Sequence, residues 1–121
     1  MKKVLAVILA CLCVFGCTAC KPAEETNTLT MVTEAAFPPF EYMEGDQLVG
    51  ADIDIANEIA KILGKELVIT NVDFDAVLSG VATGKYDFGI AGITASEERK
   101  KNMNFSDAYY VASQAIVVRA D

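Results

Sequence analysis

The side chains best suited to bind a small anion lie in one stretch, residues 87–99. An apolar run leads there into a tight turn at Gly92, which has no Cβ and therefore lets a ligand come close to the backbone. Thr94 can donate a hydroxyl hydrogen bond. Arg99 lies in the first turn of an expected helix, and its planar guanidinium can donate two parallel hydrogen bonds to a carboxylate. Because helix starts also offer unpaired N–H groups to anions, this order of residues predicts a carboxylate site.

A purely structural interpretation fits the same stretch. Its glycines, Gly89 and Gly92, are also typical of an ordinary turn. Arg99 could equally pair with a glutamate on a solvated helix face, an arrangement worth little in binding terms. The residues of this stretch, taken alone, leave both interpretations open.

Composition excludes several classes of function. The chain has 121 residues, which suits one domain, and 17 acidic against 10 basic residues give a net charge of −7. Nucleic acid is therefore not an expected partner, because phosphate binding needs a basic face. The sequence has no histidine, the commonest metal ligand and general base. All four cysteines lie within the first 20 residues, and we expect no metal and no cofactor.

The N-terminus has the pattern of an export signal. Two lysines precede an apolar run that is too short to span a bilayer comfortably. Residues 14–17 (Val-Phe-Gly-Cys) resemble a bacterial lipobox, which predicts a signal peptide at residues 1–16, lipidation of Cys17 and a polar tether at residues 17–27. Cys20 is a competing lipidation site, and a plain secretory signal is a further alternative. A diacyl anchor would attach the protein stably to the outer side of the cell membrane.

Residues 28–121 are expected to form the folded domain. β-forming residues predict strands at residues 28–33, 66–72, 86–91 and 113–119. The two prolines at 38 and 39 predict a stiff loop over residues 34–40, followed by a hairpin-type turn at residues 41–46.

Helices are expected between these strands. One runs to about Leu63 with Asp52 or Asp54 as its cap and an apolar stripe at Ile55, Ile59 and Ile62. A second covers residues 74–83, and Ser96 is expected to cap a short third helix. Strands that alternate with helices predict an open, mostly parallel α/β sheet flanked by helices.

Several ordered motifs resemble one protein family. They are similar to the extracellular solute-binding proteins of polar amino-acid ABC importers over nearly all of residues 29–119, and they lie at residues 34–42, 50–56, 74–75, 84–87, 91–94, 98–99 and 105–110. The resemblance implies a periplasmic-binding-protein fold, with two α/β lobes that close on an amino acid. It also implies that residues 28–121 are most of lobe one and that lobe two has no counterpart here. A fragment and a truncated reading frame both fit that pattern.

The same resemblance implies the roles of individual residues. Arg99 and Thr94 would hold the α-carboxylate of the ligand, beside the backbone of Ala91 and Gly92. Phe37 and Phe74 would stack against the ligand's side chain, although core packing is the commoner role of a phenylalanine. Glu34 would meet the ligand's amino group or polar side chain, and an exposed loop carboxylate is the alternative there.

The expected function is therefore to bind a polar amino acid and deliver it to an ABC transporter permease. Weak binding is expected without lobe two, because charged hydrogen bonds lose strength in water. The alternative is a cyclohexadienyl dehydratase, an enzyme class that resembles this family and acts on arogenate or prephenate. Such chemistry needs a poised acid–base group, and Glu34 is the candidate in this part of the fold. A sensor domain is a third alternative.

Overall fold

The structure is a computed structural model that describes residues 27–113 and 115–120. The predicted signal peptide (residues 1–16), the lipidation site at Cys17 or Cys20 and nearly all of the tether lie outside the described residues. In the described part of the chain, no helix combines the length and the apolar character needed to cross a membrane.

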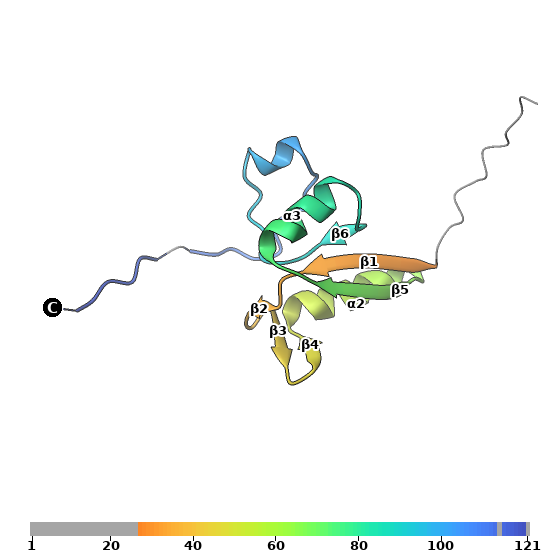
Figure 1. Cartoon of the computed structure of the whole chain (residues 1–121), viewed down its shortest axis with the longest axis horizontal. Coiled ribbons are helices and arrows are strands. Elements are labelled where there is room, and N and C mark those ends of the chain that lie inside the picture. Colours follow the sequence, from red (N-terminus) through yellow and green to blue (C-terminus); the bar gives the residue numbers. More distant parts are fainter. Residues whose placement is uncertain (1–26, 114, 121) are drawn as a thin grey trace, which may run out of the picture.

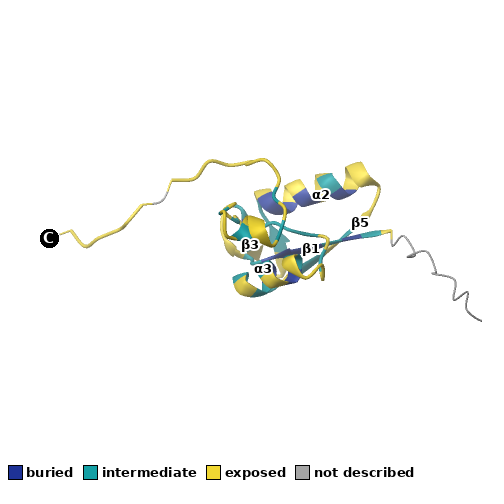
Figure 2. Ribbon diagram, turned by 90° about the horizontal axis from the view of Figure 1, so that it is seen from above, coloured by how far each residue is buried: buried dark blue, intermediate teal, exposed yellow. Residues whose placement is uncertain are grey.

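A three-stranded parallel sheet lies at the centre of the fold. Its middle strand, β1 (Thr28–Thr33), pairs with β5 (Glu66–Asn71) on one side and with β6 (Phe88–Gly89) on the other. Helix α2 (Ala51–Leu63) covers one face of the sheet and helix α3 (Phe74–Ala82) covers the other, as Figures 1 and 2 show. The predicted open, parallel α/β sheet flanked by helices is confirmed.

A second, antiparallel sheet lies beside the first. It consists of β2 (Ala36–Phe37), β3 (Glu41–Glu44) and β4 (Gln47–Val49), in that order. The last element is η1 (Arg99–Lys101), a single turn of 3₁₀ helix. The predicted hairpin after the proline loop is therefore present, and the proline loop itself contains the two-residue strand β2.

The core has two halves because successive residues of β1 point to opposite faces of the sheet. Met31 packs with Ile53 and Ala56 under α2. Val32 packs with Val77 and Ala91 under α3. One strand thus anchors both helices, and its carboxyl end is fixed between them.

The start of α2 differs from the sequence expectation. Gly50, and neither Asp52 nor Asp54, is the N-cap, and no side chain caps the helix. The backbone of Gly50 has φ +126°, and a Cβ there would lie 2.2 Å from the carbonyl oxygen of Phe40. The close approach of the Phe40 carbonyl to Gly50 therefore requires glycine at the N-cap. The two aspartates lie in the first turn of the helix, where its dipole favours them.

The predicted apolar stripe of α2 was also wrong. Ile62 is 80% exposed and Ile55 is exposed, whereas Ile53, Ala56 and Ala60 are buried. The helix is turned so that Ile53, Ala56 and Ala60 face the sheet, whereas Ile55 and Ile62 lie on its exposed side.

Two predicted strands differ in extent. The strand expected at residues 86–91 is shortened to β6. At its start, the Asp87 carboxylate accepts 2.7 Å hydrogen bonds from both the backbone N–H and the hydroxyl of Thr30, so a side chain takes the place of a strand pairing there. The backbone hydrogen bond from Thr30 lowers the pKa of Asp87. The strand expected at residues 113–119 does not form. Its described residues lie against no neighbouring strand, and Ile116 and Val117 are more than 90% exposed.

Replacing Gly50 with alanine should destabilise the fold by more than about 3 kcal/mol, because the new Cβ meets backbone atoms in a region of φ that L-residues avoid. Gly84→Ala is the matched control. Its φ is +70° but nothing lies within 4 Å of the added Cβ, so the cost should be roughly 1–2 kcal/mol. Urea unfolding followed by circular dichroism measures both. Equal losses would show that the contact with Phe40 is unimportant.

Candidate functional site

The predicted site residues follow the carboxyl ends of three parallel strands. Glu34 comes directly after β1, Phe74 begins the helix after β5, and Ala91 and Gly92 come shortly after β6. Hydrogen bonds from Val72 N–H to the Thr33 carbonyl (3.0 Å) and from Ile90 N–H to the Val32 carbonyl (3.2 Å) hold these ends together. In open α/β sheets this edge is where ligands bind.

Arg99 is held by the turn that precedes it. The Ser96 hydroxyl accepts a 3.3 Å hydrogen bond from the Arg99 backbone N–H. Ser96 is nevertheless not the cap that the sequence predicted, because the N-cap of η1 is Glu98 and no side chain caps this turn. An Nη of the guanidinium donates to the Thr94 carbonyl at 3.1 Å, and its Cζ lies 5.2 Å from the centre of the Phe74 ring. Arg99 is half-buried. Its backbone is held by Ser96, and its guanidinium is held by the Thr94 carbonyl and the Phe74 ring.

The structural alternative for Arg99 is not the one observed. Within residues 27–113 and 115–120, the two ion pairs are Lys61–Glu58 and Lys100–Glu97. Lys100, and not Arg99, thus pairs with a glutamate on the solvated face. The guanidinium keeps donors that no described side chain occupies, and the face of Phe74 supports it by a cation–π contact.

Phe37 forms the other aromatic part of the edge. It is 57% exposed, lies 5.7 Å from Phe40 in a stacked arrangement, and Phe40 in turn contacts Tyr110 edge-on. Gly92 has φ +55°, and a Cβ there would lie 3.5 Å from the Phe37 ring. Phe37 thus lies against the Gly92 turn, and this exposure argues against a core role.

The remaining predicted residues differ in how far they are exposed. Thr94 is exposed, and Glu34 is half-buried at the end of β1. Ala91 is 6% exposed and belongs to the core under α3, so only its backbone can face a ligand. Phe74 packs against the same core from the edge, and its ring face is occupied by Arg99.

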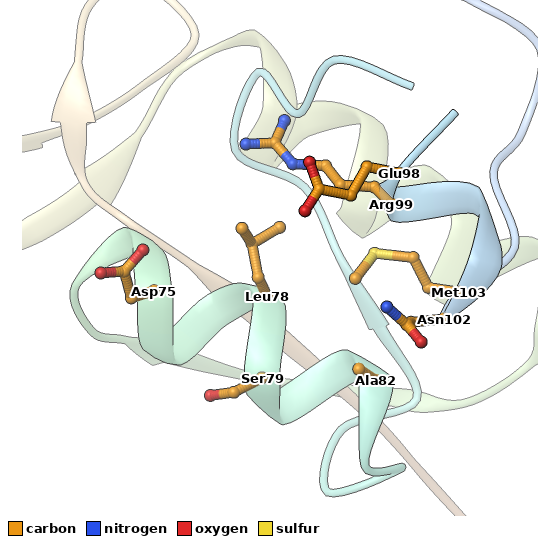
Figure 3. A pocket seen from close by; sticks show the side chains of 8 residues that line it. All are labelled: Asp75, Leu78, Ser79, Ala82, Glu98, Arg99, Asn102 and Met103. Atoms are coloured by element: carbon orange, nitrogen blue, oxygen red, sulfur yellow. The ribbon is translucent and has the colours of Figure 1, made fainter. Parts of the chain in front are cut away.

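An open cavity of about 570 Å³ lies beside this edge, between α3 and η1. Figure 3 shows Leu78 of α3 and Met103, just after η1, directed into the space between the two elements. Arg99 is the one predicted site residue in its lining, which consists of Asp75, Leu78, Ser79, Ala82, Glu98, Arg99, Asn102 and Met103. The strand-end residues therefore form an open surface, and the cavity flanks it.

Sequence reasoning missed a buried acidic pair beneath the site, Glu41 of β3 and Asp52 of α2, which we call the Glu41–Asp52 pair. Their exposed fractions are 1% and 0%. Tyr109 donates a 3.1 Å hydrogen bond to Asp52. Glu41 is the antiparallel partner of Phe37 in the pairing of β2 with β3, which the sequence did not predict.

Burial changes the protonation of Glu41 and of Tyr109. Burial raises the pKa of Glu41 to about 8, with further contributions from the hydrogen bond and charge of Asp52 and from the charge of Glu34. Burial also raises the pKa of Tyr109 above its ordinary range, assisted by the charge of Asp52. The hydroxyl of Tyr109 therefore stays protonated and remains a donor to Asp52.

The chain should lose stability relative to its Glu41→Gln variant as the pH rises from about 4.5 to about 8. The folded protein holds the Glu41 proton more tightly than the unfolded chain does. The stabilising effect of this proton is therefore complete below the pKa that Glu41 has in the unfolded chain, and it is lost as the pH rises through the pKa that Glu41 has in the folded protein. The difference should change by at most about 1.4 kcal/mol per pH unit. Urea unfolding at several pH values measures it, and a difference that is independent of pH would contradict this account.

Comparison with known proteins points to one family. The sequence model of the bacterial extracellular solute-binding proteins, family 3, matches residues 29–121. The arginine-binding extracellular protein ArtP of Bacillus subtilis (strain 168) is 36% identical over 126 aligned residues, which cover all of this chain and 49% of ArtP. The chain spans about half the length of the curated relatives it matches.

Solved structures share the fold. The arginine-bound form of domain 1 from TmArgBP is 44% identical with a TM-score of 0.67, and the match covers 69% of this chain and 68% of that domain. An ancestral cyclohexadienyl dehydratase is 34% identical with a TM-score of 0.65, covering 69% of this chain and 35% of the enzyme. The dehydratase is thus the more distant of the two.

Proposed function

The chain belongs to the bacterial extracellular solute-binding proteins, family 3, and we propose that it binds arginine outside the cytoplasm for delivery to an ABC importer permease. The observation that carries the proposal is the position of the Arg99 guanidinium and its remaining hydrogen-bond donors. Its guanidinium is held at the carboxyl edge of the sheet over Phe74, with donors that no described acidic side chain takes.

Arg99 is proposed to bind the ligand's α-carboxylate. A guanidinium matches a carboxylate in shape and can donate two parallel hydrogen bonds to it. Thr94, which is exposed one turn earlier, is proposed to add its hydroxyl, and the backbone of Ala91 and Gly92 borders the same position. The contact between Arg99 and Phe74 fixes the guanidinium before a ligand arrives, which lowers the entropy cost of binding.

Glu34 and Phe37 are proposed to receive the ligand's guanidinium. A carboxylate pairs with that group, and the exposed face of Phe37 can stack on it. Phe74 is a weaker candidate for stacking than the sequence suggested, since Arg99 already lies over its ring. Arginine is favoured over other polar amino acids by the name of the relative ArtP and by the arginine-bound domain of TmArgBP.

We propose that residues 28–121 are most of lobe one of the two-lobe fold and that they bind arginine through one of its two faces. The arginine-bound form of domain 1 from TmArgBP supports binding by a single lobe. Affinity should still be lower than for a closed pair of lobes, because water reaches the other face of the ligand and weakens the charged contacts.

An enzymatic function has less support. The ancestral dehydratase is similar in fold, but dehydration needs an acid–base group that reaches the substrate. Glu34 is half-exposed in a loop, and the carboxyl with the raised pKa, Glu41, is buried at 1% exposure beneath the surface. We therefore favour binding without turnover.

Replacing Arg99 with alanine should weaken arginine binding by about 10- to 150-fold, since a charged hydrogen bond contributes about 1.5–3 kcal/mol. Titration calorimetry with a panel of amino acids measures this. Lys100→Ala is the matched control, because Lys100 is the adjacent residue and pairs with Glu97 on the surface. Unchanged affinity in Arg99→Ala, or no heat from any amino acid with the unaltered protein, would refute the proposal.

We further propose that the mature protein begins at Cys17 and is attached to the cell membrane by a diacyl anchor, as the sequence Val-Phe-Gly-Cys at residues 14–17 suggests. Expression in a Gram-positive host should give a mature chain whose intact mass equals residues 17–121 plus a diacylglyceryl group. A Cys17→Ser variant should lack that mass. A mature terminus without lipid would remove the anchor from the account.

A further inference from the structure

The Glu41–Asp52 pair is buried, and among the described residues neither carboxyl forms an ion pair with a lysine or arginine. Both side chains are buried, and the two ion pairs among the described residues, Lys61–Glu58 and Lys100–Glu97, are elsewhere. Two adjacent carboxyls in such surroundings do not both ionise readily, because each charge is poorly solvated and repels the other. Burial, with the neighbouring Asp52, accordingly raises the pKa of Glu41 to about 8, so the Glu41 carboxyl keeps its proton over a wide range of pH.

The hydrogen-bonding pattern fits one shared proton. Oδ2 of Asp52 accepts from Tyr109. Oδ1 of Asp52 and Oε2 of Glu41 are buried without a conventional donor among the described residues, and the two carboxyls are close enough to hydrogen-bond each other. A proton shared between the carboxyls provides the missing donor, and leaving those oxygens without one would cost the full desolvation of a buried acceptor.

Glu34 links the pair to the proposed ligand site, because the charge of Glu34 acts on Glu41. The charged or titratable groups that act on Glu41 are Asp52 from α2 and Glu34 from the end of β1, and Tyr109 reaches Asp52 from the segment after η1. Glu41 is also the strand partner of Phe37. The negative charge of Glu34 thus opposes ionisation of the pair, and a ligand that neutralises Glu34 would remove that opposition.

We propose that a ligand with a cationic side chain, bound at Glu34, releases a fraction of a proton from the Glu41–Asp52 pair, so that its affinity rises with pH. This inference rests on the proposed function. The ligand's positive charge makes ionisation of the pair easier, and by linkage a state that binds fewer protons is favoured at higher pH. A neutral analogue of the same shape does not release the proton.

The release should be measurable by calorimetry near pH 8. If the ligand's charge shifts the titration by about half a pH unit, roughly 0.3 proton leaves per site. That proton is taken up by the buffer, so the heat of arginine binding should differ between phosphate and Tris buffers. Citrulline, the neutral isostere of arginine, should give the same heat in both buffers.

Variants identify the source of the proton. Glu41→Gln keeps a neutral hydrogen-bonding group, so it should still bind arginine but lose the buffer dependence. Glu44→Gln, on the exposed end of the same strand, is the matched control and should retain it. If Glu41→Gln does not fold by circular dichroism, Asp52→Asn replaces it.

Each outcome decides the question. Equal arginine heats in the two buffers, or a buffer dependence that survives in Glu41→Gln, would overturn the proposal. If arginine gives no heat at all, the proposed function fails and the linkage to ligand fails with it. Carbon NMR titration of Glu41 in the unliganded protein then judges the shared proton alone. Titration near pH 4.5 would overturn it, and titration near pH 8 would support it.

Discussion

The parallel alignment of β5, β1 and β6 is the constraint on which the rest of the structure depends. Because three parallel strands end at one edge, residues far apart in the chain, Glu34, Phe74 and Gly92, all follow strand ends at that edge. Met31 and Val32 hold the middle strand between α2 and α3. The strand ends are thereby anchored in the core, which suits a site that must hold Arg99 ready before a ligand arrives.

Two consecutive tyrosines attach the last described segment to this frame. Tyr109 donates to Asp52 at the start of α2, and Tyr110 packs edge-on against Phe40, which stacks on Phe37. The segment after η1 is thus fixed to both the buried acidic pair and the aromatic part of the site. Beyond Val111 the described residues are exposed, so this attachment ends at the tyrosines.

Local patterns predicted the fold well, and contacts between distant residues account for what they missed. The strand at residues 28–33 and the helix end at Gly64 follow from β-propensity and a glycine stop. The N-cap at Gly50 depends on how close the backbone of Phe40 lies to Gly50. The late start of β6 goes with the hydrogen bond from the Thr30 N–H to the Asp87 carboxylate. The Glu41–Asp52 pair was invisible because its burial arises only when a hairpin packs on a helix. For the site, the sequence motifs predicted residues that follow the strand ends, and the roles of these residues stay predictions. The position of Phe74 under Arg99 was not predicted.

A crystal structure of the protein soaked with arginine would test the central claim most directly. The account predicts the carboxylate of arginine within hydrogen-bonding distance of the Arg99 guanidinium, beside the Gly92 turn, with the ligand's side chain against Phe37 and Glu34. An Arg99 side chain turned outward to solvent, with no ligand at the carboxyl ends of the strands, would contradict it.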